Sequence, residues 1–209
     1  RAPTDNDIDL NTDWLRARYN WAEARAYQTR SETPGYAAVI RSRMSMTAPS
    51  VKRILTLETT WTVWNNGAID LVMDVRKDPE FPELPRFGLR LFLPESLNEA
   101  VYCGLGPKEN YCDKRQASYH RIFAAAVKEF HEDYIRPQEN GSSSGCDYVT
   151  VNGSGGFGLT AASLDPFSFN LSPYTQEELE TAAHNFELRP SGSTVLCLDR
   201  AQPGIGSNS

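Results

Sequence analysis

The sequence has few cysteines and no paired cysteine motif. Its four cysteines, Cys103, Cys112, Cys146 and Cys197, are widely and irregularly spaced. Structural zinc sites use closely spaced thiolates, and disulfide scaffolds are short and dense in cysteine, so both are disfavoured. Cys197 lies in an alternating apolar pattern and is interpreted as a small buried hydrophobe. This usage favours a reducing compartment such as the cytoplasm, with the periplasm left open.

The chain also lacks a basic excess and a long apolar run. Its formal net charge is −6, with acidic and basic residues interspersed. Such a surface does not neutralise nucleic-acid phosphates. Residues 124–127, Ala-Ala-Ala-Val, form one of its longest apolar runs, whereas a membrane helix needs roughly 20 apolar residues. We therefore expect no nucleic-acid partner and no membrane partner.

Motifs of common reaction centres are missing or lack their context. There is no Gly-x-Ser-x-Gly elbow, and the histidine at 131 lacks the second histidine of a zinc-protease helix. Residues 153–158 match the dinucleotide-binding glycine pattern, but no βαβ unit surrounds them, so we predict a turn between strands. Asp5, Asn6 and Asp7 group oxygen donors without a calcium-binding loop, which favours a turn or capping role. The sequence predicts no metal ligands and no cofactor in this chain.

Period-two alternation of apolar and polar residues dominates what is present. Residues 55–63, 69–75 and 87–93 each carry an apolar stripe on one face, and Asn65-Asn66-Gly67 between the first two is a strong hairpin signal. About ten short strands in all are typical of packed antiparallel sheets, so we predict an all-β fold. The further strands are expected near 36–47, 99–104, 146–151, 156–163, 167–171, 184–189 and 194–199.

Helices are expected to be few and short. The candidates are 13–27, 119–129 and 176–183, and the last has a capping box made by Thr175 and Glu178. No linker is long enough to separate two domains, so we predict a single domain over residues 1–209.

Two glutamates lie in polar blocks, Glu109 in Lys-Glu-Asn-Tyr and Glu139 in Gln-Glu-Asn-Gly. A pair of carboxylates could serve glycoside hydrolysis, one as acid and one as nucleophile. The preferred interpretation is that they fix loops by accepting hydrogen bonds. Tyr111 and Tyr134 beside these blocks are candidate exposed aromatics for stacking on sugars. The residues predicted to structure the loops are Glu109, Asn110, Tyr111, Glu139 and Asn140.

Seven polar blocks, taken in order, resemble the C-terminal β domain of bacterial β-galactosidases of glycoside hydrolase family 2, often called the small chain. The blocks are residues 1–7, 84–89, 102–114, 134–141, 167–175, 179–184 and 198–206. The resemblance implies an antiparallel β-supersandwich similar to galactose mutarotase, as a single C-terminal domain cut at both ends from a longer polypeptide.

The resemblance implies that the full-length enzyme hydrolyses terminal β-galactosides such as lactose with retention and is a homo-oligomer. It places the catalytic glutamates, and sites for Mg and Na, in a separate (β/α)₈ barrel that is not part of this sequence. This chain would then have no catalytic residue. Its partners would be that barrel, the other domains of the same polypeptide and the galactoside bound there.

The resemblance also implies that two segments approach the sugar pocket. Its rim residues would be Asp5, Asn6, Asp7, Ile8, Asp9, Ser207 and Asn208. The chain departs from the family pattern at three positions: Asp9 replaces a common glycine, Lys114 a common arginine and Pro203 a common methionine.

Two alternatives stay open. A free-standing carbohydrate-binding module would use the aromatics and acidic loops. An aldose 1-epimerase would use a histidine acid and a glutamate base in one cleft, although the spacing of the three histidines and the glutamates does not match that family.

Overall fold

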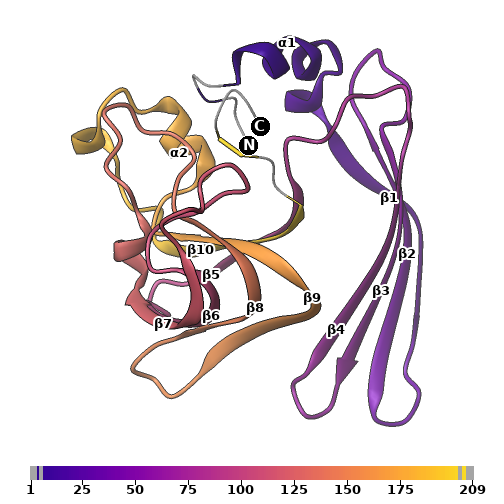
Figure 1. The fold of residues 1–209 in the computed structure, drawn as a ribbon. Helices are drawn as coiled ribbons and strands as arrows, with labels where there is room; N and C mark the ends of the chain where they lie inside the picture. The colour runs from indigo at the N-terminus through magenta and orange to yellow at the C-terminus, as the bar shows by residue number, and fades with distance from the viewer. Residues whose placement is uncertain (1–3, 5–6, 202–203, 206–209) are drawn as a thin grey trace. The chain divides into compact units, whose positions relative to one another are not determined.

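The computed structural model describes residues 4, 7–201 and 204–205. The chain divides into two compact units: Leu10–Glu83, and a discontinuous unit made of Arg1–Asp9 with Leu84–Ser209. Each unit is built around its own antiparallel sheet (Figure 1). The division does not test the predicted single domain, which stays a prediction.

The 10–83 unit is a four-stranded meander in the order β1-β2-β3-β4. Its strands are β1 (Glu23–Glu32), β2 (Ala37–Thr47), β3 (Leu55–Trp64) and β4 (Ile69–Lys77). Helix α1 (Ile8–Arg16) and the 3₁₀ turn η1 (Tyr19–Trp21) precede it. The predicted Asn-Gly hairpin joins β3 to β4, with Gly67 at a φ of 89° that favours glycine.

The other unit holds a six-stranded antiparallel sheet in the order β5-β10-β9-β8-β6-β7. The consecutive strands β6 and β7, β8 and β9, and β9 and β10 are neighbours, whereas β5 is separated from β6, and β10 lies between β5 and β9. The strands are β5 (Phe87–Pro94), β6 (Glu99–Gly106), β7 (Tyr119–Ala126), β8 (Ser142–Asn152), β9 (Gly158–Ser172) and β10 (Ser193–Ala201).

The core of this unit lies on one face of the sheet. Tyr102 and Phe169 are almost fully buried and meet edge to face at 5.1 Å between ring centroids. Phe130, in the 3₁₀ turn η2 (Val127–Phe130), packs on both rings. Alternation along β6 explains this arrangement, because Ala100, Tyr102, Gly104 and Gly106 face inward and the residues between them face out.

Helix α2 (Gln176–Thr181) begins as its sequence predicts. Thr175 Oγ1 accepts from Glu178 N at 3.1 Å, and the Glu178 carboxylate accepts from Thr175 N at 2.7 Å. A short 3₁₀ turn, η3 (Asn185–Glu187), follows. Neither α-helix in the described part of the chain is long and apolar enough to cross a membrane.

The predicted all-β class, with antiparallel sheets and few short helices, is confirmed. Three element predictions are wrong. The helix expected over 13–27 ends at Arg16, and β1 occupies its second half; the helix expected over 119–129 is strand β7; and the strand expected at 184–189 is η3. The strands expected at 156–163 and 167–171 are one continuous strand, β9.

Candidate functional site

A buried ionic cluster is centred on Arg86, immediately before β5. Its Nε and Nη2 donate to the two carboxylate oxygens of Asp199 on β10 at 2.7 and 2.6 Å, and its Nη1 donates to Glu139 at 3.1 and 3.2 Å. The side chains of Arg86, Asp199 and Glu139 are only 9%, 2% and 6% exposed, respectively. Although burial alone would lower it, the carboxylates of Glu139 and Asp199 raise the pKa of Arg86, which stays charged.

Asn170 extends this cluster toward β9 and the 139–141 loop. Its Oδ1 accepts from Arg86 Nη2 at 2.6 Å, and its Nδ2 donates to the Asn140 carbonyl at 2.7 Å. Asn140 in turn uses its side chain to bind the Glu132 N–H and the Gln138 carbonyl. The cluster thus joins segments that are far apart in the sequence, among them the loop before β8.

Glu109 organises a second group of contacts. Its carboxylate accepts from Lys114 Nζ at 2.5 Å, from the Tyr134 hydroxyl, and from Gly141 N at 2.8 Å. Partial burial would lower the pKa of Lys114, but its hydrogen bonds to Glu109 and Tyr134 raise it overall. Glu109 and Glu139 therefore bind different cations, Lys114 and Arg86.

Asn110 and Tyr111 lie inside the same loop. The Asn110 side chain, fully buried, donates to the carbonyls of Leu105 and Lys108 and accepts from Ser144 N and Oγ. Tyr111 is 2% exposed, which corrects the expectation that it offers an exposed ring. Burial, followed by the charges of Glu139 and Glu109, raises its pKa well above the ordinary value.

Segments near the two ends of the sequence meet in this unit. Asp7 is 2% exposed, and its Oδ2 accepts from Thr4 N at 2.6 Å and Thr4 Oγ1 at 2.8 Å. Thr4 Oγ1 also donates to the Ile205 carbonyl at 3.4 Å. Gly204 lies against the carboxylate of Asp113, and a Cβ at position 204 would require that side chain to move.

Asp113 also lines an open hollow of about 600 Å³ formed by residues 108–109, 113–118 and 132–134. Its lining carries charges of both signs, and Glu109, Lys114 and the neutral Tyr134 belong to the group above. Two of the seven polar blocks, residues 102–114 and 134–141, thus contribute to one hollow, and Asp113 also lies against Gly204, next to the contact of Thr4 with Ile205. This loop face is the candidate functional site.

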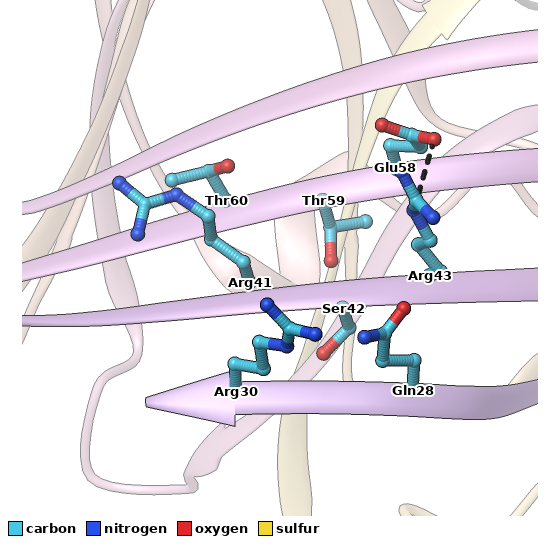
Figure 2. A pocket seen from close by; sticks show the side chains of 8 residues that line it. All are labelled: Gln28, Arg30, Arg41, Ser42, Arg43, Glu58, Thr59 and Thr60. Carbon is cyan, nitrogen blue, oxygen red and sulfur yellow. Dashed lines mark ion pairs between the residues drawn. The ribbon is translucent and has the colours of Figure 1, made fainter. Parts of the chain in front are cut away.

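A second hollow, of about 260 Å³, lies on the sheet of the 10–83 unit. Figure 2 shows Gln28 and Arg30 rising from β1 on either side of Ser42 on β2, with an ion pair of 3.3 Å between Arg43 and Glu58. Arg41 pairs with Glu32. Because two of the three guanidiniums are already paired, this hollow is interpreted as a solvated polar face rather than an anion site.

The predicted rim residues are described only in part. Asp7 occupies the turn before α1, and Ile8 and Asp9 form the first residues of that helix. Asp5, Asn6, Ser207 and Asn208 lie outside the described residues. The rim assignment and the loop-structuring role of the Glu109 and Glu139 blocks stay predictions.

Sequence analysis missed Arg86, Asn170 and Asp199 as functional or structural residues. Each stands inside one of the seven polar blocks, within an otherwise apolar strand or strand end. A charged residue in such a run has to find a partner when it is buried. A polar or charged residue within an apolar run therefore marks a candidate buried polar side chain, but the sequence does not show which residue is its partner.

Comparisons with known proteins show which family the chain belongs to. The family model described as "Beta galactosidase small chain" matches residues 1–209. The β-galactosidase of Actinobacillus pleuropneumoniae is 41% identical over 209 residues, which are 100% of this chain and 20% of the relative.

The β-galactosidase of Staphylococcus xylosus is 35% identical over 209 residues, again all of this chain and 21% of that protein. That of Lactobacillus delbrueckii subsp. bulgaricus is 34% identical over 213 residues, with 20% of its length covered. The chain therefore spans about a fifth of the length of the curated relatives it matches.

Proposed function

The chain belongs to the β-galactosidase small-chain family, as its seven ordered polar blocks predicted, and from that premise we propose that it is a non-catalytic β domain of a larger β-galactosidase. The full-length enzyme would cleave terminal β-galactosides such as lactose with retention. The acid and nucleophile, and the Mg and Na sites, would belong to a (β/α)₈ barrel elsewhere in the same polypeptide.

One observation carries this proposal: the two glutamates that were catalytic candidates already have other partners. Glu139 is paired with Arg86, and Glu109 is bound by Lys114, Tyr134 and the Gly141 N–H. A retaining glycosidase needs one carboxylate free to attack and another able to give up a proton. Glu139, held by the buried Arg86, and Glu109, held by Lys114, a tyrosine hydroxyl and a backbone N–H, are suited to neither role, which favours a supporting domain.

The role we assign to the domain is to form part of the wall of the sugar pocket. The rim would be the segment Asp5–Asp9 together with Ser207 and Asn208. Support comes from the neighbouring described residues, because Thr4 and Asp7 meet Ile205 through the Thr4 hydroxyl. Segments near both ends of the sequence would then contribute to one edge of the pocket.

The direct test is an activity assay with a chromogenic β-galactoside. We expect the folded 209-residue chain to show no turnover, whereas the full-length polypeptide assayed in parallel is active. Turnover by a clean preparation of the chain, abolished by Glu109→Gln or Glu139→Gln, would overturn the proposal.

The pocket-wall role has a separate test in the full-length enzyme. Replacing Asp7 by alanine removes the carboxylate that holds Thr4, so we expect KM to rise several-fold while kcat changes less. Thr181→Ala, a change in α2 away from this junction, serves as the control. An unchanged KM in Asp7→Ala would remove the support for a rim at this junction.

The alternatives give different results in binding and epimerisation assays. A carbohydrate-binding module would bind galactose or lactose in calorimetry with Kd near 1 mM or tighter. An aldose 1-epimerase would speed the change in optical rotation of freshly dissolved galactose. We expect neither response from the chain alone.

A further inference from the structure

Three side chains of different donor type meet on the outer side of the six-stranded sheet. Cys103 lies on β6, His120 on β7 and Asp147 on β8, and one ligand atom of each lies within 4.8 Å of the others. Asp147 Oδ2 is 3.3 Å from Cys103 Sγ and 3.3 Å from His120 Nε2. The cluster belongs neither to the Arg86 cluster nor to the loop face described above.

An irregularity in β8 helps to bring these residues to the same side of the sheet. In a regular strand, residues 146 and 149 would face opposite sides, yet Cys146 and Val149 are both fully buried. The register of β8 against β9 shifts between Cys146 and Tyr148. Asp147 therefore points outward, toward the side on which Cys103 of β6 and His120 of β7 lie.

The spacing of the donor atoms fits a tetrahedral metal ion. Zn²⁺ binds thiolate sulfur at about 2.3 Å and imidazole nitrogen or carboxylate oxygen at about 2.0–2.1 Å, which puts tetrahedral ligand atoms about 3.3–3.5 Å apart. The separations of Asp147 Oδ2 from Cys103 Sγ and from His120 Nε2 match that range, and the third pair of donor atoms lies within 4.8 Å. Only small rotations of exposed side chains would be needed to enclose an ion.

We propose that Cys103, His120 and Asp147 form a binding site for Zn²⁺ or a similar borderline-soft divalent cation, with a fourth position open to water. The thiolate and imidazole donors favour such ions over Mg²⁺ and Ca²⁺, which prefer oxygen ligands. His120 and Asp147 side chains are 48% and 57% exposed, so an ion can enter from solvent. The proposal departs from the prediction of no metal ligand because the donors are too far apart in sequence to form a spacing motif.

A bound ion would link three neighbouring strands. Strand β7 is at the edge of the sheet and pairs only with β6. Since an ion that binds only the folded state stabilises it, Zn²⁺ should raise the melting temperature of the chain and protect the edge strand from exchange with solvent.

The test is titration of the metal-free, reduced chain with Co²⁺ and then Zn²⁺. We expect a thiolate-to-cobalt charge-transfer band that Zn²⁺ displaces, and a Zn²⁺ affinity by calorimetry that falls at least about 10-fold in Cys103→Ser, His120→Ala and Asp147→Asn. All three positions are on the solvent side of the sheet, and circular dichroism checks that the variants fold.

Two matched controls separate this site from adventitious binding. Cys112→Ser removes another exposed thiol, and His184→Ala removes another exposed histidine paired with a carboxylate; both should leave the band and the affinity unchanged. Absence of the band, or a band that survives Cys103→Ser, would overturn the proposal and leave the three groups as mutually hydrogen-bonded surface residues.

Discussion

At the scale of the residue, Arg86 is the side chain whose replacement we expect to lower the stability of the fold most. One guanidinium pairs with two carboxylates that are both nearly inaccessible to solvent, Glu139 and Asp199. Its geometry also depends on Gly88, because a Cβ there would overlap the Leu198 carbonyl oxygen and push β5 away from β10.

The first prediction is that Arg86→Met destabilises the fold by about 3–5 kcal/mol, since it leaves two buried carboxylates without their cation. Urea unfolding followed by fluorescence measures the loss. The matched control is Arg90→Met, which removes an exposed pair with Glu177 and should cost less than about 1 kcal/mol. Equal losses in the two variants would show that burial does not set the value of the Arg86 pairs.

At the scale of the element, α2 depends on its first residue. The helix has only the six residues Gln176–Thr181, so the capping box satisfies a large share of its free N–H groups. Thr175→Ala should lower the free energy of unfolding by about 1 kcal/mol. Thr181→Ala, inside the same helix, should change it by less than about 0.5 kcal/mol. A Thr175→Ala variant as stable as the parent would mean that tertiary contacts alone hold α2.

Strands with an apolar stripe could be predicted from the sequence, whereas the edge strands β1 and β7, which lack a regular stripe, could not. The alternation in β3, β4 and β5 marks the more buried face of each strand, and these strands and β10 were found where expected. In contrast, β1 is exposed along nearly its whole length and is rich in Ala, Arg, Glu and Gln, which favour helix. Its strand conformation comes from pairing with β2, and local propensity does not contain that information.

The same reason explains the error at 119–129 and the incomplete prediction of the site. Strand β7 ends in Ala124-Ala125-Ala126, a good helix sequence, and is a strand because it pairs with β6. For the site, the polar blocks could be located, but which carboxylate meets which cation depends on the strand order. Arg86 and Asp199 lie far apart in sequence and meet only because β5 pairs with β10.

At the scale of the whole molecule, stability should decrease in alkaline solution. Burial, with a smaller contribution from Asp147, raises the pKa of Cys146 from 9.0 to about 12. Burial likewise raises that of Cys197 from 9.0 to about 11. The unfolded chain therefore releases these protons above pH 9.0 while the folded chain keeps them. The stability they contribute is complete below pH 9.0 and is lost as pH rises through 11–12.

We accordingly expect the free energy of unfolding to fall between pH 9 and pH 11, with each buried thiol contributing a slope of up to about 1.4 kcal/mol per pH unit. Urea titrations under reducing conditions at several pH values measure it. Cys146→Ala should flatten the slope, and Cys112→Ala, at an exposed thiol, should leave it unchanged. A slope that persists in Cys146→Ala and Cys197→Ala would have to come from other groups.

The position of β10 has a consequence for how the protein is made. Among the described strands it is synthesised last, yet it sits in the interior of its sheet, hydrogen-bonded to β5 on one side and β9 on the other. Until Ser193–Ala201 has emerged, β5 has no neighbour and the Arg86 guanidinium has no Asp199. Translation that stops before this strand would release a chain in which β5 and β9 each lack a hydrogen-bonding neighbour. We expect such a chain to be degraded by quality-control proteases.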